Sequence, residues 1–472
     1  MGRAPSRVEP AAPSGELFVR RSRIAAPAAD VFRWHARPGA FERLAPPWER
    51  VAVVERTGGI EDGARVVLRM GAGPLTVRWV AEHRDYVEGE QFRDVQVSGP
   101  FARWEHTHRV VPDGPEACYL TDCIEYALPF GALGALVAGG SARRRLARTF
   151  AYRHRVTAQD VAAHARAGGR EMKVLVTGSS GLIGSALTPL LTTGGHTVVR
   201  LVRDAGKRRP GTVAWDPGSG VIDTAALEGF DAVVHLAGEN ISGRWTAEKK
   251  ARIRDSRVEG SRHLVRALTG LARPPKTLVA ASAIGFYGNR DADLVDEDSA
   301  PGAGFLADVV REWEAATRSA AARGIRVVNL RFGVVLSAAG GALATMLPPF
   351  RFGFGGPVGS GEQYMSWIAI DDAIGAVLHA LLTPTLSGAV NAVAPNPVTN
   401  AEFAKTLGRV VSRPAFLPLP AFAVRLAFGE MGEELLLAST RVEPHRLKES
   451  GYEFRFPALE GALRHVLGRD VG

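Results

Sequence analysis

Three regularly spaced glycines are the residues whose chemical use is clearest in this chain. Gly178, Gly181 and Gly184 follow an apolar strand pattern, Val174 to Val176, and open a helical pattern. A second strand pattern, His196 to Val202, completes a strand–helix–strand unit. Glycines so placed let the chain turn sharply and approach a pyrophosphate, and the helix N-terminus offers free N–H groups to the phosphates. The segment predicts a dinucleotide-binding loop.

The loop residues expected to contact the cofactor belong to one short stretch, "GSSGLIG". Backbone N–H groups converge there at the start of the helix. A glycine-rich turn in another α/β fold, with no ligand, is the alternative. The predicted cofactor-binding residues of the loop are Gly178, Ser180, Gly181, Leu182, Ile183 and Gly184.

The end of the second strand bears on the choice between NAD and NADP. An acidic side chain there binds the ribose 2′-hydroxyl, whereas a basic one accepts a 2′-phosphate. The strand ends in "RLVRDAGKRR". Arg203 comes first, and Lys207, Arg208 and Arg209 lie just beyond, so we predict NADP. Asp204 is the competing signal for NAD.

Longer motifs resemble the extended short-chain dehydrogenase/reductase superfamily of NAD-dependent epimerases and dehydratases. They are "TGSSGLIG", "DAVVHLAG", "LVAASAIGFYG", "VVNLRFGVVLS" and "SWIAIDDAIGAVLHAL". The resemblance implies an α/β fold with a Rossmann-type doubly wound parallel sheet. It also implies that the cofactor is bordered by backbone at Leu236, Ala237, Gly238 and Gly333.

Several longer motifs resemble one branch of that superfamily, the SDR39U1-like epimerase family. "GENISGRWT", "GFLADVVREWEAA" and the segment after "RFGVVLS" carry this resemblance. The C-terminal "PLPAFAVRLAFGEMGEELLLAST" resembles the small module of unknown function that ends these proteins.

The catalytic pair of the superfamily is missing from this chain. The resemblance implies a Tyr and a Lys four residues later on one helix face, where the Lys cation helps the Tyr act as an acid or base. Phe305 and Val309 stand in those places. If catalysis survives, Tyr287 and Ser282 are our candidates for the proton chemistry, although Tyr287 could equally pack at the end of its strand.

The lost Lys would normally also bond the nicotinamide ribose, so another residue must hold that part of the cofactor. Arg257, in "ARIRDSRVEGS", is our candidate. The helix that bears it follows the fourth strand and borders the cofactor in the resembled fold. A solvated helix charge is the alternative.

The first half of the chain has a different pattern. Short alternating runs separated by Gly, Pro and Asp predict an antiparallel sheet, with a long helix from about Ala132 to Ala165 after it. The order resembles the START-like, polyketide cyclase/dehydrase-type helix-grip fold, an α+β domain that implies an apolar ligand. His106 and His108 share a strand face and either line its cavity or are satisfied within the core. With no third ligand at suitable spacing, we predict no metal site.

Composition narrows the functions considered. The 472 residues carry a net charge of +9, yet no zinc spacing or aromatic RNA-binding pattern is present, so we expect no nucleic-acid partner. No apolar run reaches bilayer length, and the two cysteines fit a reducing, cytoplasmic compartment. The sequence leaves the oligomeric state open.

The favoured function is an NADP-dependent oxidoreductase or epimerase-like enzyme for an unknown small molecule. A non-catalytic NADP-binding sensor or scaffold is the alternative, and ligand binding by the first domain alone is a third. The predicted organisation is a disordered tail (1–15), a START-like domain (16–166), a linker (167–171), an NAD(P)-binding Rossmann domain (172–408) and a C-terminal module packed on it (409–472).

Overall fold

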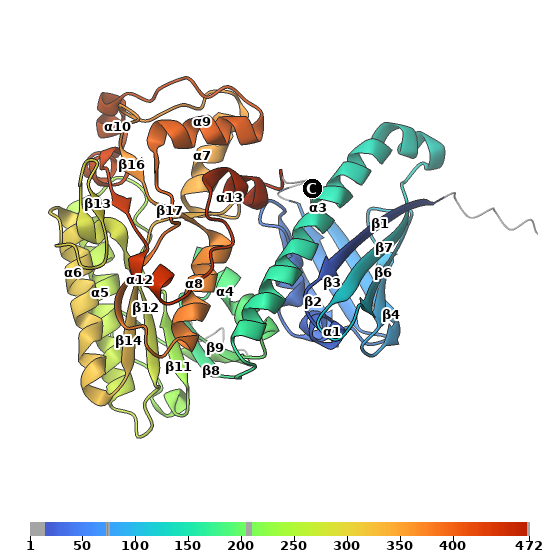
Figure 1. Ribbon diagram of the computed structural model, residues 1–472, viewed down its shortest axis with the longest axis horizontal. Coiled ribbons are helices and arrows are strands. Elements are labelled where there is room, and N and C mark those ends of the chain that lie inside the picture. The colour runs from blue at the N-terminus through green and yellow to red at the C-terminus, as the bar shows by residue number, and fades with distance from the viewer. Residues whose placement is uncertain (1–14, 72, 74–75, 204–209, 470–472) are drawn as a thin grey trace, which may run out of the picture. The chain divides into compact units, whose positions relative to one another are not determined.

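A computed structural model describes residues 15–71, 73, 76–203 and 210–469 (Figure 1). The chain divides into two compact units. Unit 1 comprises the described part of Met1–Ala36 together with Glu49–Ala158, and unit 2 comprises Arg37–Trp48 and the described part of Gln159–Asp470. Among the described residues, no helix is both long and apolar enough to span a bilayer.

Unit 1 is a seven-stranded antiparallel sheet with helices at both ends of its sequence. Its interior contains Phe18, Trp104 and Ile124 from the sheet, packed with Phe150 from the long helix α3. This confirms the START-like prediction of a strand, a helix, several strands and a long helix. In sheet order the strands are β1 (Glu16–Ile24), β7 (Cys118–Ala127), β6 (Arg103–Pro112), β5 (Gln91–Ser98), β4 (Val77–Val87), β3 (Arg65–Met70) and β2 (Val51–Thr57). The helices are α1 (Ala28–Ala36) and α3 (Gly131–Arg166), whose last turns belong to unit 2.

Unit 2 is built on a seven-stranded parallel sheet, which confirms the Rossmann-type prediction. Its central strands are nearly continuous apolar runs because both faces are covered. In β8, Val174 and Val176 face one core and Leu175 faces the other. In sheet order the strands are β10 (Thr212–Ala214), β9 (Thr197–Val202), β8 (Lys173–Thr177), β11 (Ala232–His235), β12 (Thr277–Ala283), β14 (Arg326–Phe332) and β18 (Gly388–Ala392).

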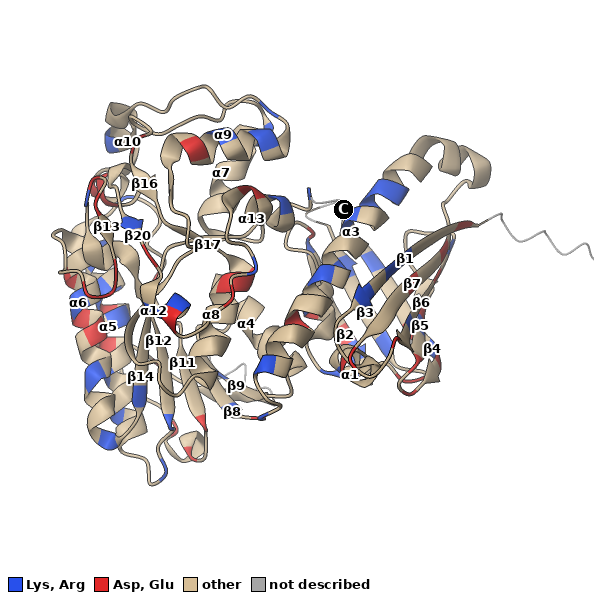
Figure 2. Ribbon diagram, in the orientation of Figure 1, with Lys and Arg blue, Asp and Glu red and all other residues tan. Residues whose placement is uncertain are grey.

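Helices cover the two faces of this sheet. One core receives side chains of α4 (Leu182–Thr193) and α8 (Ile370–Leu382), and the other receives those of α5 (Ala247–Thr269). The helix α6 (Phe305–Arg318) packs beside α5. Figure 2 shows charges of both signs along α5 and α6, which are joined by the pair Arg254–Glu312 at 2.5 Å.

The remaining elements of unit 2 are short. The helices are α2 (Ala40–Leu44), α7 (Gly341–Arg351), α9 (Asn400–Val411), α10 (Ala421–Phe428), α11 (Glu430–Gly432), α12 (His445–Glu449) and α13 (Leu459–Val466). Single turns lie at Ala225–Leu227, Ile284–Tyr287, Ser319–Arg323 and Glu433–Leu437. Three two-stranded pairs are β13 (Leu294–Val295) with β20 (Arg441–Val442), β15 (Val334–Leu336) with β17 (Trp367–Ala369), and β16 (Tyr364–Met365) with β19 (Val398–Thr399).

A buried ionic cluster ties distant segments together inside unit 2. Arg43 of α2 makes two bonds to Asp160, at 2.7 and 2.9 Å, and one to Asp371, at 2.8 Å. Arg455 also bonds Asp160, at 2.8 Å, and His465 lies 3.0 Å from Asp371. Because charges buried this deeply need partners, the cluster fixes where Arg37–Trp48 joins unit 2. The division into two compact units does not test the domain limits predicted from the sequence, which remain proposals.

We predict that Asp160→Asn destabilises unit 2 by about 3–5 kcal/mol, because two buried arginines lose their shared carboxylate charge. Asp255→Asn is the matched control. Asp255 is exposed and its contact with Arg254 is 3.6 Å long, so that variant should cost at most about 1 kcal/mol. Denaturant unfolding measures both, and equal costs would contradict the role given to the cluster.

Candidate functional site

The glycine-rich loop joins β8 to α4, and its shape requires glycine at two positions. Gly178 has a φ of 65°, and a Cβ there would lie 2.6 Å from the backbone carbonyl of Leu236. A Cβ on Gly184 would lie 2.3 Å from the carbonyl oxygen of Gly178. The loop backbone therefore lies against the end of β11 on one side and against the first turn of α4 on the other.

The remaining predicted loop residues lie at and after the tip of this turn. Ser180 and Gly181 are exposed, whereas Leu182 and Ile183 are half-buried and pack on the core. Gly181 begins α4 with extended backbone, and within the described chain no side chain caps the helix. The N–H groups of its first turn are therefore available to an anion.

The hydroxyl of Thr177 links the loop to the end of β11. Its Oγ1 accepts hydrogen bonds from the backbone N–H groups of Leu236 and Ala237, both at 3.1 Å. It also lies 2.7 Å from Nδ1 of His235. These bonds place the predicted residues Leu236 and Ala237 beside the phosphate loop, where both are half-buried.

His235 continues this link into the helices. Burial lowers the pKa of His235 to about 4, so its ring is neutral. Thr177 then donates to Nδ1, and Nε2–H donates to Oγ of Ser261 on α5 at 3.0 Å. Trp313 of α6 donates to the same oxygen at 3.0 Å. One chain of bonds thus connects the loop, β11, α5 and α6.

Arg257 is not a freely solvated helix charge. Its Nη1 donates to the carbonyl of Glu239 at 3.0 Å, and its guanidinium lies 3.3 Å from where a Cβ of Gly238 would stand. Burial lowers its pKa to about 10. The N–H of Glu239 donates to Ser256 of the same helix at 2.9 Å. Arg257 and Ser256 of α5 therefore hold the segment that follows β11. Gly238, within this segment, is exposed.

Arg203 is exposed directly after β9. The hydrogen bond from Lys249, followed by the charges of Lys249, Arg252 and Arg203, lowers the pKa of Glu239. Asp204, Lys207, Arg208 and Arg209, which also bore on the choice of cofactor, lie outside the described residues.

Gly333 lies between β14 and β15, where the backbone leaves the sheet. A Cβ there would lie 2.5 Å from the carbonyl oxygen of Ser366, so only glycine fits. The carboxyl ends of parallel strands share one edge of a sheet, and the ends of β8, β11 and β14 therefore bring the predicted backbone sites to the same edge.

The helix face that would carry Tyr and Lys is packed instead. Val309 and Trp313 are buried, and Phe305 stacks edge-to-face on Trp245 with ring centres 5.2 Å apart. Lys250 lies 4.5 Å above the ring of Phe305. The apolar stripe of α6 is thus a packing surface.

Tyr287 is completely buried. Its hydroxyl donates to Oδ1 of Asn391 at 2.8 Å and accepts from Nη1 of Arg331 at 2.9 Å. Burial raises its pKa to about 12, against the opposing effect of Arg331. These contacts favour a structural role for this phenol.

Ser282 belongs to the same network. Its Oγ donates to Oε1 of Glu314 at 2.6 Å. Glu314 also receives two bonds from Arg331, both at 2.8 Å. The network therefore joins both sequence-predicted catalytic residues through Arg331 and Glu314, which sequence reasoning missed. Both lie within family motifs quoted above, "GFLADVVREWEAA" and "VVNLRFGVVLS", but no local spacing pairs Glu314 of α6 with Arg331 of β14.

A pocket of about 250 Å³ opens beside the end of β12. Glu434 spans the start of α6 there, because its carboxylate accepts from the N–H groups of Phe305 at 2.8 Å and Leu306 at 2.9 Å. Polar side chains of the lining are Asn289, Glu433, Glu434 and Thr440. The C-terminal segment thus supplies part of the wall.

In unit 1, His106 and His108 are buried and contact two carboxylates, Asp94 and Asp122. Neither carboxylate was predicted from the sequence. They come from the strands on either side of the histidines, 12 to 16 positions away in the chain, and only the register of the sheet brings them together.

Known proteins share this architecture. The fold and loop define a Rossmann-type protein of the extended short-chain dehydrogenase class. The model of the NAD dependent epimerase/dehydratase family matches residues 174–392, a domain of unknown function matches 419–466, and the polyketide cyclase/dehydrase and lipid transport model matches 24–155.

Individual relatives show which family within this class the chain belongs to. An epimerase family protein of Mycobacterium bovis is 47% identical over 63% of this chain and 98% of its own length. The human epimerase family protein SDR39U1 is 41% identical over 63% of this chain and 100% of its own. The chain belongs to this epimerase family, as predicted.

Two solved structures of this class are similar to the chain in both fold and sequence. A nucleoside-diphosphate sugar epimerase from Corynebacterium glutamicum matches with a TM-score of 0.79 and 33% identity, over 96% of this chain and 90% of its own. Human SDR39U1 (isoform 2), solved with NADPH, matches with a TM-score of 0.58 and 40% identity, over 63% of this chain and 99% of its own.

We predict that Glu314→Gln lowers stability by about 3 kcal/mol or more, since Arg331 is buried and loses a bidentate partner. Glu312→Gln on the same helix is the control and should cost at most about 1 kcal/mol, because both members of its pair with Arg254 are substantially exposed. Thermal unfolding compares the two variants. A Glu314 variant as stable as the control would contradict the structural role of the network.

Proposed function

We propose that this chain binds NADP at the loop of unit 2 and acts as an NADP-dependent oxidoreductase or epimerase-like enzyme on a small molecule. The observation that carries the proposal is the uncapped start of α4, held against β11 by the contacts of Gly178 and Thr177. The likeness to human SDR39U1, which was solved with NADPH, supports the same cofactor.

The residues fit the parts of the dinucleotide. The first turn of α4 offers N–H groups to the pyrophosphate, and Arg203 offers a cation to a 2′-phosphate. Leu236, Ala237, Gly238 and Gly333 supply backbone along the sheet edge, and Arg257 holds the Gly238–Glu239 segment in place. The bound cofactor would supply or accept a hydride.

The substrate is proposed to bind in the pocket beside β12. Asn289 and Thr440 present hydrogen-bonding groups, while Glu433 and Glu434 make the wall acidic. The assignment of proton chemistry to Tyr287 and Ser282 stays a prediction from sequence. Their hydrogen bonds to Asn391, Arg331 and Glu314 support a positioning role at the end of β12 instead.

A non-catalytic NADP-binding sensor is the second candidate. The packing of Phe305, Val309 and Trp313 in place of a proton relay favours it. NADPH absorbance separates an oxidoreductase from a sensor, because net turnover changes the oxidation state of the nicotinamide. An epimerase regenerates its cofactor in each cycle, so conversion of the substrate separates it from a sensor.

We also keep the proposal that unit 1 binds an apolar ligand. The match of residues 24–155 to the polyketide cyclase/dehydrase and lipid transport model supports it. A rise in the melting temperature of the full chain with fatty acids or aromatic polyketides would be the sign of binding.

We predict that wild type binds NADPH more tightly than NADH, and that Arg203→Ala weakens NADPH binding by about 10–100-fold through loss of a charge-assisted contact. NADH binding should change little. Titration calorimetry measures both. Arg200→Ala, an exposed arginine of β9, the strand that Arg203 follows, is the control and should behave as wild type. Equal losses for both cofactors would contradict a contact to the 2′-phosphate.

We predict that Tyr287→Phe lowers stability by about 1–3 kcal/mol, because Asn391 and Arg331 each lose a buried partner. Any turnover found in a screen of nucleoside diphosphate sugars and small carbonyl compounds should persist within about 3-fold, a change of roughly 0.7 kcal/mol in barrier. Steady-state kinetics and thermal unfolding measure the two effects. A loss of kcat by a factor of about 100 or more would assign Tyr287 a catalytic role.

A further inference from the structure

A second set of chemistry-bearing side chains lies inside unit 1, apart from the dinucleotide loop. Asp94 comes from β5, His106 and His108 from β6, and Asp122 from β7. His154 of α3 closes the set, with Nε2 2.6 Å from Oδ2 of Asp122. His106 and His108 therefore lie between the carboxylates of Asp94 and Asp122.

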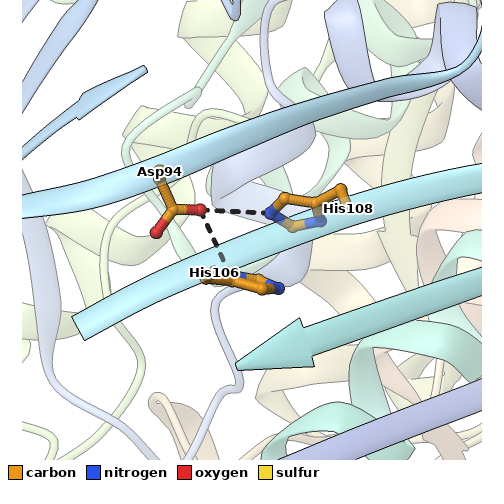
Figure 3. Close-up of side chains that lie close together, drawn as sticks. All are labelled: Asp94, His106 and His108. Carbon is orange, nitrogen blue, oxygen red and sulfur yellow. Dashed lines mark hydrogen bonds and ion pairs between the residues drawn. The ribbon is translucent and has the colours of Figure 1, made fainter. Parts of the chain in front are cut away.

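The Asp94 side of this cluster has the spacing of a coordination shell. Oδ1 of Asp94 lies 3.1 Å from Nδ1 of His106 and 3.2 Å from Nε2 of His108 (Figure 3). One possible ligand atom from each of the three residues lies within 4.8 Å of the other two. Metal bonds of about 2.1 Å place neighbouring ligand atoms roughly 3.0–3.4 Å apart in octahedral or tetrahedral sites. The observed contacts match those edges.

The Asp122 side has the form of an outer shell. Oδ1 of Asp122 lies 2.8 Å from Nε2 of His106 and 2.7 Å from Nδ1 of His108. Each ring thus turns one nitrogen to Asp94 and the other to Asp122. Metal-bound imidazoles commonly donate their second N–H to a carboxylate, which fixes the tautomer and orientation.

Hydrogen bonds pair His106 and His154 with Asp122, and His108 with Asp94. Nδ1 of His108 lies beside Asp122 without the alignment of a hydrogen bond, and Nδ1 of His154 is buried with no partner. The rings of His106 and His108 are only 3.8 Å apart between centres. Two imidazoles and two carboxylates therefore meet at one place in the sheet.

Packing holds the two rings in place. Phe92 stacks on His108 with ring centres 4.2 Å apart, and Phe150 meets His106 edge-on at 5.1 Å. Both histidines are buried, and the Asp94 side chain keeps 19% exposure. Two carboxylates in this apolar shell need positive charge nearby, and the guanidinium of Arg153 on α3 already interacts with both.

We propose that Asp94, His106 and His108 bind a divalent first-row transition-metal ion, Zn²⁺ or Fe²⁺, with Asp122 as the carboxylate that orients both imidazoles. Two nitrogens and one carboxylate oxygen suit these borderline ions rather than Ca²⁺ or Mg²⁺. Three protein ligands leave a coordination position for water or for an oxygen atom of a small molecule. The proposal differs from our expectation from sequence, which found no third ligand, because Asp94 lies on a neighbouring strand.

The first test uses the full chain. Protein stripped with a chelator is titrated by calorimetry with Zn²⁺, and anaerobically with Fe²⁺, and the metal content after dialysis is measured by mass spectrometry. One ion retained per chain is the expected result. Replacement by Co²⁺ should give visible absorption bands of a site with nitrogen ligands. Wild-type protein that retains no ion and shows no saturable binding overturns the proposal, without reference to any variant.

Variants locate the ion. Asp94→Asn and His108→Gln should abolish binding, whereas Asp122→Asn should weaken it by about 10–100-fold, as expected for an outer-shell partner. His83 lies directly opposite Asp94 in the sheet, so a variant there tests neighbours of the site. The matched control is His445→Gln, an exposed histidine of α12 paired with Glu449, which should bind as wild type does. Circular dichroism checks that each variant folds, and unchanged stoichiometry in folded Asp94 and His108 variants would place the ion elsewhere and overturn the proposal.

Discussion

The close approach of the glycine-rich loop to the end of β11 is the constraint on which the candidate site depends. Gly178 can lie against Leu236 only because it lacks a side chain, and Thr177 secures the contact by accepting two backbone N–H groups. The same hydroxyl donates a hydrogen bond to His235, which in turn donates one to Ser261 of α5. An uncapped helix start and the edge of the sheet are thereby held at a fixed separation, which is what recognition of a dinucleotide requires.

The other side of the site shows how a helix can lose a proton relay and keep its place. In α6 the positions of the absent Tyr and Lys contribute to apolar packing, and Glu314 further along the helix binds Arg331 of β14. A buried, bidentate ion pair positions the end of β12 through Ser282 and Tyr287. The arrangement is compatible with hydride chemistry that uses another proton donor, or with binding alone.

Local patterns predicted much of this structure, and contacts between distant segments account for the rest. The glycine spacing, the alternation of strands and helices, and the family motifs predicted the Rossmann sheet, the loop and the helix-grip order. The catalytic role of Tyr287 stays a prediction from sequence, whereas its hydrogen bonds to Asn391 and Arg331 join segments far apart in the chain, which no local pattern reveals. The carboxylate partners of His106 and His108 also depend on sheet register, which no spacing within one strand reveals.

A crystal structure of the full chain grown with NADPH tests the central claim most directly. We expect the pyrophosphate to lie at the first turn of α4 and the 2′-phosphate to lie beside Arg203. Leu236 to Gly238 should lie along the cofactor. A dinucleotide bound elsewhere, or a loop that stays empty at saturating NADPH, would contradict the assignment of unit 2 as an NADP-binding domain.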